Sequence, residues 1–130
     1  MDVLGVPTTV AESQRLGGAA VQVMLTVARS CPGAVMDSTW YAYTRPLIAR
    51  LGGYVVEVHC SCPVEVARER YRERAKLRHG GHLDDQRTDD DLFGRDARVG
   101  LAGCIEVDTA TPIDVSAVVD RIWRRTADAC

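Results

Sequence analysis

Apolar residues recur at helical spacing in four stretches of the chain. The first runs from about Val10 to Ser30 and places its apolar residues near one face, although Gly17 and Gly18 weaken its middle. The same spacing predicts further helices at residues 41–51, at residues 63–78 and from about Asp114 onward. The last of these carries its apolar residues on one side: Val115, Val118, Val119, Ile122 and Trp123.

Three short apolar stretches between these helices are typical of strands. The clearest covers residues 54–60 and is rich in β-branched side chains. Residues 34–36 and 104–108 form two shorter stretches with turn-forming residues beside them. Because strands alternate with helices, we expect parallel pairing and an α/β fold with helices on both faces of the sheet.

Polar residues follow each expected strand, at the edge where parallel α/β sheets bind their ligands: Asp37-Ser38-Thr39, Ser61 and Asp108-Thr109. A carboxylate at Asp37 suits magnesium binding through water, or proton transfer from a hydroxyl, and Ser38 or Thr39 would orient the same ligand. The alternative is that these three residues cap the following helix, and spacing alone favours it.

A row of arginines is the second candidate. Arg70, Arg74 and Arg78 share one face of the helix expected at residues 63–78 and lead into a polar segment at residues 79–100. This segment holds three more arginines: Arg87, Arg95 and Arg98. Phosphoryl transfer needs such cations around the phosphate oxygens, delivered when a lid closes. The alternative is a solvated face whose arginines pair with neighbouring glutamates.

A zinc site is the third candidate. Cys60 and Cys62 lie at the same strand end, and His79 and His82 follow after a helix. Two cysteines separated by one residue on a strand have poor geometry for chelation. We therefore rank a zinc-stabilised α/β module below ordinary free cysteines.

Composition and charge narrow the class of protein. The chain has 130 residues, of which 46% are hydrophobic and 26% charged, as expected for one globular domain. A net charge of -2 gives no strong signal for nucleic acid or an anionic membrane. No apolar run approaches the roughly 20 residues that span a bilayer, and no secretory signal is evident, so we expect a cytoplasmic protein.

Taken together, these features resemble the small P-loop kinase and phosphotransferase group. This group includes polynucleotide kinase-like, chloramphenicol phosphotransferase-like and zeta-toxin-like proteins, often labelled AAA-type ATP-binding domains. The resemblance rests on the order of four features along the chain: residues 35–40, residues 56–60 with the helix at 63–74, the lid-like segment at 79–100, and residues 107–109.

The resemblance implies an ATP-dependent kinase that uses magnesium and moves a γ-phosphoryl group to a hydroxyl of an unidentified small-molecule acceptor. By this resemblance, Asp37 would bind magnesium or activate the acceptor, and Arg70 and Arg74 would lie on the lid side of the phosphates. The implied cofactor-binding residues are Ser38, Thr39, Arg78, Thr109 and Pro112, of which the last two would flank the base.

The chain departs from the group in one defining element. The Gly-x-x-x-x-Gly-Lys-Ser/Thr loop that cradles phosphates is absent, and the single lysine, Lys76, belongs to a predicted helix. We therefore expect one partial domain over residues 1–130 that lacks the first two strands of a three-layer P-loop fold, through a miscalled start or a truncated gene.

The group usually orders its strands 2-3-1-4-5, so residues 34–36, 54–60 and 104–108 correspond to strands 3, 4 and 5. Without strand 1, strand 3 is separated from strand 4 and two strand edges are left unpaired, which favours aggregation. As it stands, the chain is not expected to be an active kinase. A degenerate, non-catalytic binding or regulatory module is the main alternative.

Overall fold

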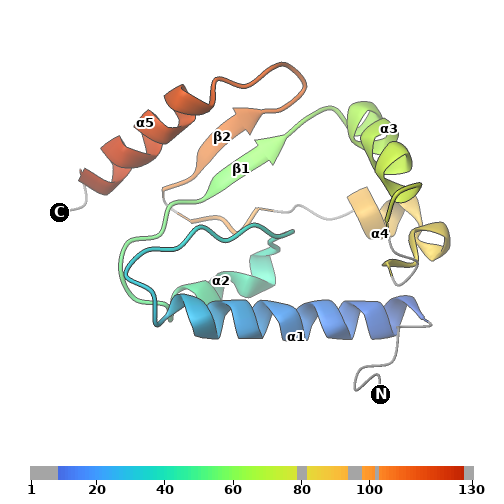
Figure 1. The fold of residues 1–130 in the computed structure, drawn as a ribbon, viewed down its shortest axis with the longest axis horizontal. Coiled ribbons are helices and arrows are strands. Elements are labelled where there is room, and N and C mark those ends of the chain that lie inside the picture. Colours follow the sequence, from blue (N-terminus) through green and yellow to red (C-terminus); the bar gives the residue numbers. More distant parts are fainter. Residues whose placement is uncertain (1–8, 79–81, 94–97, 102, 128–130) are drawn as a thin grey trace. The chain divides into compact units, whose positions relative to one another are not determined.

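The computed structural model describes residues 9–78, 82–93, 98–101 and 103–127 of the chain (Figure 1). The fold is mixed α/β, with a single pair of strands in the described residues. The α-helices are α1 (Val10–Ala28), α2 (Arg45–Ile48), α3 (Val64–Ala75), α4 (Asp89–Phe93) and α5 (Val115–Ala127). The strands are β1 (Val58–Ser61) and β2 (Ile105–Asp108), and two short 3-10 helices cover Ala42–Thr44 and Asp84–Gln86.

The chain divides into two compact units. The first consists of Met1–Asp37 and Glu69–Arg95, and the second of Ser38–Arg68 and Asp96–Cys130. The buried hydrophobic side chains of the described residues are few and fall in both units: Leu25 and Leu83 in the first, and Ile48, Val99, Ile105 and Val107 in the second. Each unit therefore has only a small core, which implies a modest free energy of unfolding.

Helix α1 confirms the first predicted helix, and a reciprocal cap sets its start. The Thr9 hydroxyl accepts a hydrogen bond from the Glu12 backbone N–H, and the Glu12 carboxylate accepts one from the Thr9 N–H, both at 3.2 Å. This capping box satisfies two N–H groups that have no partner inside the helix. Gly17 and Gly18 are accommodated within the helix.

Strands β1 and β2 pair in parallel, as predicted, and run from Val58 opposite Ile105 to Ser61 opposite Asp108 (Figure 1). The paired strands come from the stretches predicted at residues 54–60 and 104–108. Two strands are too few to establish a three-layer fold with helices on both faces, which stays a prediction.

Strand β1 is shorter than predicted and begins at Val58 rather than Tyr54. Its partner β2 has only four residues. At the amino end of β2, the Ile105 N–H donates to the Glu57 carbonyl at 2.7 Å, and the ladder ends there. A β-branched sequence extends a strand only where a neighbour supplies hydrogen bonds. Tyr54 to Val56 lead into the sheet without joining it.

The strand predicted at residues 34–36 is wrong. These residues have no regular secondary structure, and the Val35 side chain is fully exposed. Within the described part of the chain, β1 and β2 pair only with each other, so no neighbour supplies a ladder to this stretch. Three apolar residues alone do not hold an extended conformation.

The helix predicted at residues 41–51 is broken into the 3-10 helix Ala42–Thr44 and the short helix α2. The buried Thr44 hydroxyl donates to the Tyr41 carbonyl at 2.6 Å, and Pro46 lies in the first turn of α2. As predicted, the helical stretch ends before glycine: Gly52 has a φ of 74°, in the left-handed region.

Helices α3 and α5 confirm the predicted helices at residues 63–78 and after Asp114, with α3 three residues shorter at its end. The predicted apolar side of α5 is only partly covered, because Val118 and Ile122 are half-buried while Val119 and Trp123 are exposed. Among the described residues, none of the helices combines the length and apolar character that crossing a bilayer requires.

Candidate functional site

Thr109, the first residue after β2, links the carboxyl ends of β1 and β2 through two hydrogen bonds. Its backbone N–H donates to the Ser61 carbonyl at 2.7 Å, and its hydroxyl donates to the same oxygen at 2.9 Å. The exposed Asp108 carboxylate accepts the Ala110 N–H at 2.8 Å and so fixes the first turn of the loop that follows β2. Pro112, also exposed, belongs to the same loop. Parallel α/β sheets bind their ligands at this edge.

The predicted arginine row lies on α3 and the turn after it. Arg70 and Arg74 are exposed on the helix, and the Arg74 guanidinium lies 5.9 Å from the centroid of the Tyr71 ring. Arg78 follows the helix and is half-buried. The three arginines therefore differ in environment, although their spacing is regular.

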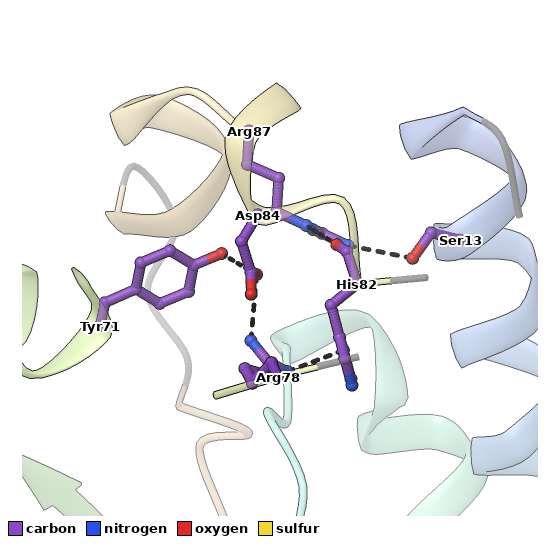
Figure 2. A network of polar contacts seen from close by, with 6 residues as sticks. All are labelled: Ser13, Tyr71, Arg78, His82, Asp84 and Arg87. Atoms are coloured by element: carbon purple, nitrogen blue, oxygen red, sulfur yellow. Dashed lines mark hydrogen bonds and ion pairs between the residues drawn. The ribbon is translucent and has the colours of Figure 1, made fainter. Parts of the chain in front are cut away.

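Arg78 and Tyr71 converge on one carboxylate, that of Asp84 (Figure 2). The Tyr71 hydroxyl donates to Asp84 Oδ1, and Arg78 Nη1 donates to the same oxygen at 3.1 Å. The Asp84 side chain is only 11% exposed, so this ion pair is better shielded from water than an ordinary surface pair. The contacts bind the start of the polar segment to α3.

His82 is the second partner of Arg78. Arg78 Nη2 lies 2.8 Å from His82 Nδ1 (Figure 2). Because a guanidinium only donates, Nδ1 must be the acceptor, and a neutral ring then carries its proton on Nε2. The Arg78 guanidinium is thus held between a carboxylate and an imidazole.

Arg87 ties the same segment to α1. Its Nη2 donates to the Ser13 hydroxyl and its Nε to the His82 carbonyl, both at 3.2 Å (Figure 2). An edge-on contact between the Tyr71 and Phe93 rings, with centroids 6.3 Å apart, adds α4 to this assembly. Residues 82–93 of the lid-like segment are therefore held against α3 and α1 by these contacts.

Burial is the main cause that raises the pKa of Tyr71 to about 12, and the hydrogen bond and charge of Asp84 add to it. The nearby Arg78 and Arg87 oppose the shift. At neutral pH the phenol therefore stays protonated and serves as a hydrogen-bond donor rather than a base.

The residues predicted for the site fall in both units. Asp37, Arg70, Arg74 and Arg78 belong to the first unit, and Ser38, Thr39, Thr109 and Pro112 to the second. Asp37, Ser38 and Thr39 are exposed, and no strand ends at Asp37 because residues 34–36 are not extended into a ladder. Within each unit, the structure brings Thr109 to Ser61 and Arg78 to Asp84.

The predicted zinc ligands are only partly described, because His79 lies outside the described residues, as does Arg95 of the arginine set. Cys60 is exposed and Cys62 half-buried, and both are free thiols. Across residues 9–78, 82–93, 98–101 and 103–127, no group of three or more His, Cys, Asp or Glu side chains is placed to hold a metal ion.

Among the residues not anticipated as site residues are Tyr71, Asp84 and Glu57. The Glu57 carboxylate accepts hydrogen bonds from the backbone N–H groups of residues 99–101. Glu57 interrupts an apolar run, which is a usable signal, because a charged residue inside a strand must find a partner. Asp84 is one of several acidic residues in the polar segment, and the sequence does not distinguish it from the others.

Lys76, the single lysine, pairs with Glu73 at 2.7 Å on the exposed surface at the end of α3. This position is unlike that of a phosphate-loop lysine, which opens a helix behind a glycine-rich turn. Comparisons with family models, curated proteins and solved structures found no match to the chain.

Proposed function

We propose that the chain is part of an ATP-dependent phosphotransferase related to the small P-loop kinases, whose full form moves a γ-phosphoryl group to a hydroxyl of a small molecule. The observation that supports this proposal lies at the carboxyl ends of β1 and β2. There the N–H and the hydroxyl of Thr109 both donate to the Ser61 carbonyl. In a doubly wound sheet, this edge holds the ligand.

In this proposal, the loop from Thr109 to Pro112 is the base side of the nucleotide site. The hydrogen bonds from Thr109 and to Asp108 fix the backbone at its start, so the loop does not need to be ordered by the ligand. A preorganised backbone and a rigid proline ring are suited to packing against a planar base.

The proposed phosphate contacts come from the arginine row. Arg70 and Arg74 are exposed on α3 and are the proposed partners of phosphate oxygens. We assign Arg78 a positioning role, because its guanidinium is held by Asp84 and His82. Magnesium would bind at Asp37, as the resemblance implies.

A second candidate function is a non-catalytic nucleotide-free binding or regulatory module. The observation that favours it is Lys76, which is paired with Glu73 on an exposed helix end. Without a lysine on the β- and γ-phosphates, transfer by these 130 residues alone is not expected.

Titration of the ¹⁵N-labelled chain with Mg·ATP tests the proposal. We expect saturable shifts of the amide signals of residues 108–111, with a Kd of about 1 mM, because the phosphate loop contributes nothing. Inorganic tripolyphosphate with magnesium should leave these four signals in place, since it has no base. Thr109→Val should weaken ATP binding several-fold, whereas Thr126→Val, on α5, should not.

Two results would overturn the proposal. One is a folded chain whose 108–111 signals do not respond to Mg·ATP, which supports the non-catalytic module. The other is an equal response to tripolyphosphate, which means that the loop does not contact the base.

A further inference from the structure

A pocket of about 310 Å³ lies within the second unit, away from the carboxyl edge of the strands. Its walls are formed by residues that precede β1 and β2 in the sequence and by the end of α5. They include Ile48, Gly53, Tyr54, Val55, Leu101 and Arg125. The volume lies at the lower end of the range of small-molecule sites, about 300–1,000 Å³.

Consecutive glycines shape one wall. Gly52 and Gly53 both have left-handed backbones, with φ of 74° and 75°, and no atom lies within 4 Å of the place where a Cβ would stand. In the segment that leads into β2, a Cβ at Gly103 would lie 3.4 Å from the Tyr54 hydroxyl. The glycines thus leave the wall open, and Tyr54 lies against the bare backbone of Gly103.

The lining combines an apolar surface with one cation. Ile48, Val55 and Leu101 supply the apolar surface, and Arg125 is the charged residue of the lining. Within the described part of the chain, no hydrogen bond or ion pair engages the Arg125 side chain. The neighbouring Arg124 differs, because its Nε donates to the Asp120 carbonyl at 3.3 Å.

We propose that this pocket binds a small organic carboxylate with an apolar body. The apolar part would lie against Ile48, Val55 and Leu101, and the carboxylate would receive two parallel hydrogen bonds from Arg125. A single guanidinium balances one negative charge, so a monoanion fits better than a phosphate dianion. The site is distinct from the proposed nucleotide site, because its lining comes from the segments that lead into β1 and β2 and from the end of α5, and includes no residue of the loop from Thr109 to Pro112.

Titration of the ¹⁵N-labelled chain with 3-phenylpropionate tests this site. We expect saturable shifts of the Gly52, Gly53, Val55 and Gly103 amides at millimolar ligand. The neutral 3-phenylpropanamide, which has the same shape, should bind at least about fivefold more weakly, a loss of about 1 kcal/mol. Phenyl phosphate should also bind more weakly than the carboxylate.

Matched variants separate the charge from the fold. Arg125→Gln should weaken 3-phenylpropionate binding at least about fivefold, while Arg124→Gln, one residue away on α5, should bind like the unaltered chain. Arg125→Lys keeps the charge but loses the planar guanidinium, so its affinity for 3-phenylpropionate should lie between those of the two glutamine variants. This variant also tests the site if Arg125→Gln does not fold.

Three results would overturn the assignment: no saturable shift at the four amides, equal binding of the acid and its amide, or equal losses in the Arg124 and Arg125 variants. Tighter binding of phenyl phosphate would replace the carboxylate with a phosphate monoester and so contradict the proposed ligand.

Discussion

The carboxylate of Glu57 accepts a hydrogen bond at 3.1 Å from the backbone N–H of Gly100, a residue 43 positions later in the chain. The N–H groups on either side converge on the same carboxylate, Val99 at 2.7 Å and Leu101 at 2.9 Å. Gly100 has a φ of 78°, and this left-handed residue turns consecutive N–H groups toward one point. Glu57 directly precedes β1, so these three hydrogen bonds hold the segment that precedes β2 against the start of β1.

We expect Glu57→Gln to lower the free energy of unfolding by about 1–3 kcal/mol, measured by urea denaturation. Glutamine has the same length, but it replaces one acceptor oxygen with an amide that faces backbone donors. Glu69→Gln, an exposed change on α3, should stay within about 0.5 kcal/mol. Equal midpoints for the two variants would show that the three contacts add nothing to stability.

Tyr71 should make stability depend on alkaline pH. Because burial and Asp84 raise the folded-state pKa to about 12 from an unfolded value near 10, the folded state holds the phenolic proton longer. The contribution is fully present below about pH 10 and is lost as pH rises toward about 12. Tyr71→Phe should flatten this part of the stability profile, and Tyr43→Phe, at an exposed position, should leave it unchanged. Identical profiles for all three proteins would contradict the Tyr71–Asp84 contact.

Cys104 should react slowly with alkylating agents. Burial raises the pKa of its thiol above the ordinary value, and the charges of Glu57 and Glu106 act in the same direction. Because the thiolate is the reactive form, iodoacetamide at pH 8 should modify the exposed Cys31 before Cys104, as measured by peptide mass spectrometry. Glu106→Gln should speed the reaction at Cys104. If Cys104 reacts as fast as Cys31, the thiol is not placed among these groups.

The sequence predicts the long helices well, because their periodicity is local. Helix α1 follows from apolar spacing over three to four turns, and α3 from its charged rows and the proline before it. Periodicity and charged rows need no knowledge of the tertiary contacts. The short helix α4, which begins after the Thr88–Asp91 capping contacts, is not among the predicted helices.

The strands and the polar networks depend on partners that lie far along the chain. Residues 34–36 and 54–60 have strand composition, but only the part opposite β2 joins a ladder, and composition does not identify the partner. In the same way, Asp84 acquires its role from the positions of Tyr71 and Arg78. Spacing predicts the regular arginine row, but not that Arg78 is held by Asp84 and His82.

Photolabelling of the folded chain with 8-azido-ATP and magnesium tests the proposed base site most directly. Cleavage after arginine yields the peptide of residues 99–121, and fragmentation of this peptide locates the label. The nucleotide proposal predicts a label within residues 108–112 that is suppressed by excess ATP and persists in excess tripolyphosphate. Labelling elsewhere, or labelling that ATP does not suppress, would contradict a nucleotide site at the carboxyl ends of β1 and β2.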